Sequence, residues 1–166
     1  RQDRGAVRHP LTRRMGERDP LEGLDLRNAS PADADDVAAL LQTLGYPCDT
    51  DDAMERIALI VDNDRQALVL ARHSGAVCGL VALDFMYYLP LGTTTCRITA
   101  MVVTPEAQGR GVGRQLLREA ERRARTGGAA RLEITSGSQR TDAHAFYKAC
   151  GYGDGTVRFV KALLNA

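Results

Sequence analysis

Three glycines that alternate with other residues separate a strand-like segment from an amphipathic helix. Residues 108 to 113 read Gln-Gly-Arg-Gly-Val-Gly. Glycine reaches backbone conformations that other residues avoid, and it lets another group approach the main chain closely. The first N–H groups of a helix lack partners within the helix and lie at its partly positive end, which favours an anion. The segment therefore predicts a turn that binds a phosphate, in particular a pyrophosphate. A turn with glycines for packing alone is the alternative.

Composition narrows the class of protein. A chain of 166 residues is long enough for one domain with its own core. With 22 basic and 21 acidic residues, no overall field favours a nucleic-acid or membrane partner. The four cysteines and three histidines are scattered, so we expect no metal site, and Cys78 and Cys96 are interpreted as small core residues. Since no apolar stretch is long enough to span a bilayer, a cytoplasmic protein is expected.

Periodicity and turn signals predict an α/β domain with a mixed sheet and the order β-α-α-β-β-β-α-β-α-β. Residues 1–23 are rich in arginine and proline without periodicity and are interpreted as an N-terminal extension, and residues 24–166 as the domain. Strands are expected at residues 24–27, 67–72, 76–85, 97–103, 131–135 and 157–163. Helices are expected from Ser30 to Gly45, from the Asp49–Asp52 cluster to Ile60, from Val112 to the Gly127-Gly128 pair, and from Thr141 to Ala149.

Three phosphate-binding patterns compete for the glycine segment. A Walker loop needs a lysine after its last glycine, and none follows here. A dinucleotide fingerprint fits Gly109 and Gly111, but the third glycine, Gly113, comes one residue early, although Glu133 lies at the separation expected of a ribose-binding acid. The third pattern, Gln/Arg-x-x-Gly-x-Gly/Ala, matches Gln108-x-x-Gly111-x-Gly113 without a gap.

This third pattern resembles the acetyl-CoA-binding motif of the GCN5-related N-acetyltransferase (GNAT) family. The resemblance covers roughly residues 24 to 163 and includes three further segments, namely residues 26–33, 100–105 and 143–152. It implies the GNAT fold and an enzyme that transfers the acetyl group of acetyl-CoA directly to a primary amine of a small molecule, a peptide or a protein. Family members are often dimers, so a homodimer is possible.

The resemblance also implies positions for the parts of acetyl-CoA. Its pyrophosphate is expected at the main-chain N–H groups from Gly109 to Arg114, with side-chain contacts from Gln108 and Arg110. The cofactor-binding residues of this loop are then Gln108, Gly109, Arg110, Gly111, Val112, Gly113 and Arg114. The pantetheine arm is expected along the main chain of Met101, Val102 and Val103, where an N–H would polarise the thioester carbonyl.

Tyr147 falls on the tyrosine of the family's later motif, which implies a general acid that protonates the departing sulfur. A half-buried core tyrosine is the alternative. The family often has an asparagine seven residues earlier, but this chain has Arg140, which would either meet a cofactor phosphate or lie solvated beside the helix cap.

The acceptor amine must lose a proton before it attacks, and many relatives place a carboxylate on the strand before the loop. This strand carries Arg97 and Thr99 instead. The remaining candidates for the base are Asp84, Glu133, His73 and His144. Arg97, if it faces the acceptor, favours a substrate with its own carboxylate. The acidic cluster Asp49–Asp52, with Tyr87 and Tyr88, favours a cationic acceptor, unless it only caps a helix.

Two other functions fit the loop. A non-catalytic acyl-CoA sensor would bind coenzyme A without turnover. An NAD-dependent oxidoreductase would prefer NAD to acetyl-CoA.

Overall fold

The computed structural model describes residues 20–164, so most of the predicted extension, residues 1–19, lies outside the described residues. The chain divides after Glu133 into two compact units, residues 1–133 and 134–166, which are described separately.

A five-stranded sheet organises the first unit, with its strands in sequence order. The strands are β1 (Asp25–Asn28), β2 (Gln66–His73), β3 (Ala76–Tyr88), β4 (Thr93–Val103) and β5 (Arg131–Ile134). Strands β1 to β4 pair antiparallel. Two contacts join β4 to β5, one between Thr95 and Arg131 and one between Arg97 and Glu133. The residue numbers rise together along the two strands, as in a parallel pair. The sheet is therefore mixed, as predicted.

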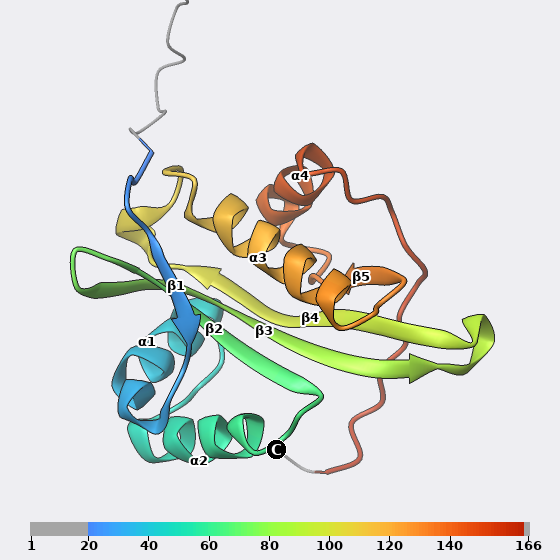
Figure 1. The fold of residues 1–166 in the computed structure, drawn as a ribbon, viewed down its shortest axis with the longest axis horizontal. Helices are drawn as coiled ribbons and strands as arrows, with labels where there is room; N and C mark the ends of the chain where they lie inside the picture. Colours follow the sequence, from blue (N-terminus) through green and yellow to red (C-terminus); the bar gives the residue numbers. More distant parts are fainter. Residues whose placement is uncertain (1–19, 165–166) are drawn as a thin grey trace, which may run out of the picture. The chain divides into compact units, whose positions relative to one another are not determined.

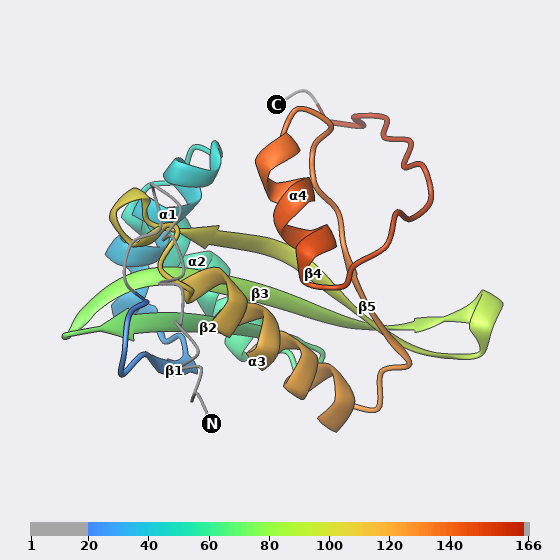
Figure 2. The ribbon, with the colours of Figure 1, turned by 90° about the horizontal axis from the view of Figure 1, so that it is seen from above.

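Helices cover both faces of this sheet (Figures 1 and 2). The short helix η1 (Pro31–Asp33), α1 (Ala34–Leu44) and α2 (Thr50–Val61) lie on one face, and α3 (Val112–Thr126) lies on the other. One buried cluster joins α1 and α2 to the sheet through side chains such as Val37, Ile57, Leu70 and Leu80. On the other face, α3 buries Val112, Leu116, Leu117, Ala120 and Ala124, the stripe that the spacing of four predicts.

Gly79 sets how closely α3 approaches the sheet. A Cβ at this position would lie 3.0 Å from the Val102 carbonyl oxygen, 3.1 Å from Leu116 and 3.3 Å from Val112. Since Val112 and Leu116 lie in the first two turns of α3, only a residue without a side chain lets the start of this helix pack directly over β3 and β4.

The hairpin of β3 and β4 is longer than predicted. The predicted strands end at Phe85 and begin at Arg97, whereas the observed strands continue to Tyr88 and start at Thr93, on either side of the turn η2 (Leu89–Leu91). Pairing of Tyr88 with Thr93 closes this arm. Pro90, Leu91 and Gly92 therefore lie in the turn that joins the two strands.

The second unit contains α4 (Thr141–Ala149), which has the predicted bounds. The prediction of a final strand at residues 157–163 is wrong, because this segment has no regular secondary structure. A strand needs a neighbour for its backbone hydrogen bonds, and an apolar pattern alone does not supply one. The large apolar side chains of the segment are instead more than three-quarters exposed, at Val157, Phe159, Val160 and Leu163.

Candidate active site

The glycine loop joins β4 to α3 through the short helix η3 (Pro105–Ala107). Gly109 and Gly111 both have positive φ, at 71° and 84°, and a Cβ at either would meet nothing within 4 Å. The first N–H of α3 to find an acceptor is that of Gln115, which donates to the Gly111 carbonyl at 3.1 Å. Within residues 20–164, the N–H groups of Val112, Gly113 and Arg114 donate to no protein acceptor. The loop thus presents open backbone donors at a helix N-terminus, as the glycine pattern predicts.

Two hydrogen bonds hold the loop in place. The side-chain amide of Gln108 donates to the Val103 carbonyl at 3.2 Å, so one end of the predicted contact residue is engaged within the protein. The N–H of Leu21 donates to the Arg110 carbonyl at 3.0 Å, and Leu21 is buried. Leu21 lies within the range predicted as an extension, yet it packs beside this loop.

A β-bulge interrupts β4 just before the predicted pantetheine segment. Ala100 pairs with Ala82 and Ile98 pairs with Leu83, so Thr99 is an extra residue opposite β3. A bulge bends its strand and redirects the neighbouring groups. Beyond it, Met101 and Val102 are buried and Val103 is half-buried, so their side chains pack into the core.

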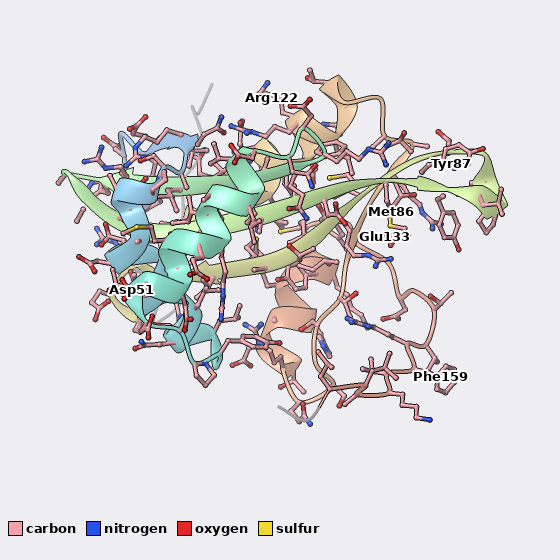
Figure 3. The ribbon with its side chains drawn as sticks, turned by 90° about the horizontal axis from the view of Figure 1, so that it is seen from below. Asp51, Met86, Tyr87, Arg122, Glu133 and Phe159 are labelled. Atoms are coloured by element: carbon pink, nitrogen blue, oxygen red, sulfur yellow. The ribbon has the colours of Figure 1, made fainter. Side chains whose placement is uncertain are left out.

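Before the bulge, charged residues gather at the end of the sheet that α1 and α2 leave uncovered. Asp84 follows Leu80 and Ala82 at a spacing of two, so it lies on the same face as these core residues. Arg97 is paired directly opposite Asp84. Glu133 of β5 accepts from Arg97 at 3.1 Å and forms an ion pair with Arg131. Figure 3, which looks onto this face, shows Glu133 and Met86 to the side of α2, toward Tyr87 of the hairpin arm.

The structure separates the four candidates for the base. Both carboxylate oxygens of Glu133 already accept hydrogen from guanidinium groups, Oε2 from Arg97 and Oε1 from Arg131. His73 pairs with Ala76 at the opposite end of β3. His144 belongs to the second unit. Asp84 remains as the carboxylate on the uncovered face with no hydrogen bond or ion pair within residues 20–164.

Arg131 is the residue of this group that sequence reasoning missed. Its guanidinium lies 4.4 Å from the centre of the Tyr88 ring, and its Nε donates to Thr95 at 3.3 Å. The pairing of Asp84 with Arg97 had a signal in the sequence, because the two residues are equally far from a turn centred on residues 89–92. The alternation of Arg131 and Glu133 with apolar residues in β5 places both on one face.

In the second unit, Tyr147 is buried and packs between Phe146 and Tyr152, with ring centres 5.4 Å and 6.1 Å away. Burial raises the pKa of its phenol, and the charge of Arg140 partly opposes this rise. Arg140 itself occupies the N-cap position of α4 without a side-chain cap bond. In the loop before α4, the buried hydroxyl oxygen of Ser136 has no hydrogen-bond partner within the described chain.

Two of the four cysteines, Cys78 and Cys96, are not candidates for nucleophiles. Cys78 and Cys96 are buried, and burial raises the pKa of both thiols, that of Cys96 to about 11. Among residues 20–164, no group of three or more potential metal ligands comes together. In the same part of the chain, no helix combines the length and apolar character that crossing a bilayer requires.

A cavity of about 680 Å³ lies away from the glycine loop, among the segment before β2, the hairpin arm and the C-terminal end of α3. Phe85, Arg122 and Gly127 are among the residues that line it, whereas the loop residues 108–114 do not. This cavity is therefore not the phosphate-binding site that the sequence predicts.

Comparisons with known proteins agree with this geometry. Residues 34–152 match the Acetyltransferase (GNAT) family. The chain is 34% identical over 140 residues to an aminoalkylphosphonate N-acetyltransferase of Salmonella typhimurium, covering 84% of this chain and 91% of the relative. It is 31% identical over 131 residues to an aminoglycoside N(6')-acetyltransferase type 1 of Stenotrophomonas maltophilia, covering 76% and 84%.

Its fold is similar to that of a GNAT family acetyltransferase from Staphylococcus aureus, with a TM-score of 0.72 and 24% identity over 84% of this chain and 98% of the other. The predicted family and fold are thus confirmed. The chain belongs to the GNAT acetyltransferase family and is an N-acetyltransferase.

Proposed function

We propose that the protein transfers the acetyl group of acetyl-CoA to the primary amine of a small molecule, with the cofactor held by the glycine loop. The observation that carries this proposal is the set of open N–H groups of Val112, Gly113 and Arg114. They follow a glycine in the left-handed conformation, and no side chain obstructs the approach of a phosphate. Acetyl-CoA supplies the reactive thioester when it is bound.

Residues of the first unit fit the remaining cofactor contacts. Gly109, Gly111 and the amides up to Arg114 would hold the pyrophosphate, with Gln108 and Arg110 at the edge of the loop. The backbone of Met101, Val102 and Val103 would hold the pantetheine arm. The bulge at Thr99 supports this assignment, because it disturbs the regular pairing of β4 with β3 beside that segment.

Proton transfer needs groups on both reactants. An alkylammonium with a pKa near 10 is only about 0.1% neutral at pH 7, a deficit of about 4 kcal/mol that water or a base must offset. Asp84 would meet the amine end of an acceptor, where this carboxylate or a bound water would take up the proton. Tyr147 would protonate the departing thiolate, since its raised pKa keeps the phenol protonated at neutral pH.

The names of the two relatives support a small-molecule acceptor. One acts on aminoalkylphosphonates and the other on aminoglycosides. Both classes carry primary amines, but the first is zwitterionic and the second polycationic. The acceptor of this chain is therefore a small amine, which we expect to be present in solution as the ammonium.

Thermal shift in the presence of acetyl-CoA, coenzyme A, ATP and NAD tests the cofactor. Binding to the folded state alone stabilises it by about 2.7 kcal/mol when the ligand is at about 100 times its Kd. We expect acetyl-CoA and coenzyme A to raise Tm, and a panel of amines to release free thiol from acetyl-CoA. A rise with NAD and none with acetyl-CoA would indicate the oxidoreductase. Binding of coenzyme A without thiol release from any amine would indicate the sensor.

A further inference from the structure

We infer that the uncovered end of the sheet selects a small zwitterionic acceptor, whose anionic group is bound by Arg97 and Arg131 and whose amine lies toward Asp84. This inference rests on the proposed function, because it names the substrate class of the same enzyme. It commits to an aminoalkyl phosphonate, sulfonate or carboxylate over a neutral amine or a polyamine.

The two guanidinium groups have donors to spare. Arg97 uses Nε and one Nη on Glu133, and Arg131 uses Nε on Thr95 and one Nη on Glu133. Within residues 20–164, Nη1 of each arginine donates to no protein group. Guanidinium groups bind phosphonate and carboxylate oxygens through paired hydrogen bonds, so the free Nη1 groups suit an oxyanion.

The arginines are held in position before a ligand arrives. Glu133 bridges them, with its own side chain only 27% exposed. The ring of Tyr88 and the fully buried Thr95 fix the plane of Arg131. Arg97 remains 40% exposed and Arg131 38%. A preorganised and accessible donor pair loses little side-chain freedom on binding.

The charges of this face explain why the ligand should carry both signs. Two guanidinium groups share one carboxylate, Glu133, which leaves one positive charge uncompensated around Arg97 and Arg131. Asp84, opposite Arg97 in the β3–β4 register, adds one unpaired negative charge beside it. A zwitterion matches both, whereas a polycation would meet the two arginines and a neutral amine would leave their donors unused.

The decisive experiment compares kcat/KM for 2-aminoethylphosphonate, taurine and β-alanine with that for propylamine, which matches them in length, and with that for the diamine putrescine. We expect at least one zwitterion to exceed propylamine about tenfold or more. Arg97→Gln should lower kcat/KM for the zwitterion about tenfold more than it lowers kcat/KM for propylamine. Arg97→Lys keeps the positive charge but not the paired donors of a guanidinium. It should therefore leave a kcat/KM advantage for the zwitterion between that of the wild type and that of Arg97→Gln. Arg56→Gln, an exposed arginine on α2, is the matched control.

Three results would overturn the inference. The first is equal kcat/KM for zwitterionic and neutral amines in the wild type, or a preference for putrescine. The second is an equal effect of Arg97→Gln on both classes, with a lowered Tm, as expected of a strand cross-link alone. The third is loss of the acetyl-CoA thermal shift in this variant, which would assign Arg97 to the cofactor.

A binding measurement separates this inference from the proposed function. Calorimetry with 2-aminoethylphosphonate and the coenzyme A complex requires no turnover. If no amine is acetylated but the wild type binds the zwitterion and Arg97→Gln binds it about tenfold more weakly, the anion site stands and the proposed reaction fails. If acetylation of neutral amines proceeds and the zwitterion does not bind, the reaction stands and the anion site fails.

Discussion

At the scale of single residues, burial separates the groups that can react from those that cannot. The raised pKa of Cys78 and Cys96 keeps both thiols protonated at neutral pH and hence weak nucleophiles. The same effect on Tyr147 keeps its phenol in the form that can donate a proton. The raised pKa also widens the gap to a thiol of ordinary pKa near 8.5, so the donation is uphill unless the bound thiolate is itself destabilised by burial.

Replacement of this tyrosine tests the acid. Tyr147→Phe should lower kcat about a hundredfold or more, the lower range of a general-acid contribution, with little change in the Kd for acetyl-CoA. Tyr46→Phe, at an exposed tyrosine between α1 and α2, is the control for the loss of a hydroxyl and should keep most of the activity. Steady-state kinetics and calorimetry together decide it. An unchanged kcat in Tyr147→Phe would remove the acid role.

At the scale of elements, the strengths and limits of sequence reasoning follow from where each signal resides. The helical segment formed by η1 and α1 was predictable at both ends, because Ser30 and Pro31 begin η1 and Gly45, with φ of 102°, ends α1. These signals are local. The strand predicted at residues 157–163 depends on a partner elsewhere in the chain, which its own residues do not reveal.

The candidate site divides in the same way. The glycine loop was predictable from six adjacent residues, including the positive φ of Gly109 and Gly111. The neighbourhood of Asp84, Arg97, Arg131 and Glu133 was not, because it depends on the register of three strands. The predicted β4 began at Arg97, four residues later than the observed strand, so the prediction did not reveal the pairing of Asp84 with Arg97.

Two glycines that flank α3 allow a matched test of the loop. Gly111 precedes the helix with φ of 84°, Gly128 follows it with φ of 71°, and a Cβ would meet nothing within 4 Å at either. Alanine at each should cost a similar strain of about 1 kcal/mol. Only Gly111→Ala adds a methyl group beside the open amides, so only this variant should bind acetyl-CoA more weakly. Equal Kd values in the two variants, by calorimetry, would argue against a cofactor at this loop.

At the scale of the whole molecule, contacts of charged side chains attach the edge strand of the first unit to helices on both faces of the sheet. Strand β1 has four residues and one neighbour, β2. Arg27 of β1 pairs with Asp33 of η1 at 2.6 Å. Asn28 accepts from Arg123 of α3 at 2.6 Å, and Glu119 holds that arginine at 2.7 Å. Arg27 and Asn28 therefore connect β1 to helices on opposite faces, and Asp33 and Glu119 bind the arginines of these two contacts.

Both carboxyl groups have a low pKa in the folded protein. The hydrogen bond from Arg27 lowers the pKa of Asp33 to about 2, and that from Arg122 lowers the pKa of Glu119 to about 2. Their ordinary values are 3.8 and 4.5. Since the unfolded chain takes up protons first, the stabilisation is complete above about pH 4.5 and is lost as pH falls toward 2. The free energy of unfolding should decrease across this window.

Asp33→Asn isolates one of these contributions. From the shift in pKa, it should lower the free energy of unfolding by about 2 kcal/mol at pH 7. The difference from the wild type should shrink to about half near pH 3 and almost vanish near pH 1, because the wild-type carboxyl is then protonated too. Urea titrations at several pH values measure this, with Glu55→Gln, an exposed carboxylate on α2, as control. A difference that stays constant with pH would mean that Asp33 stabilises the fold through shape and neutral hydrogen bonds, and not through its charge.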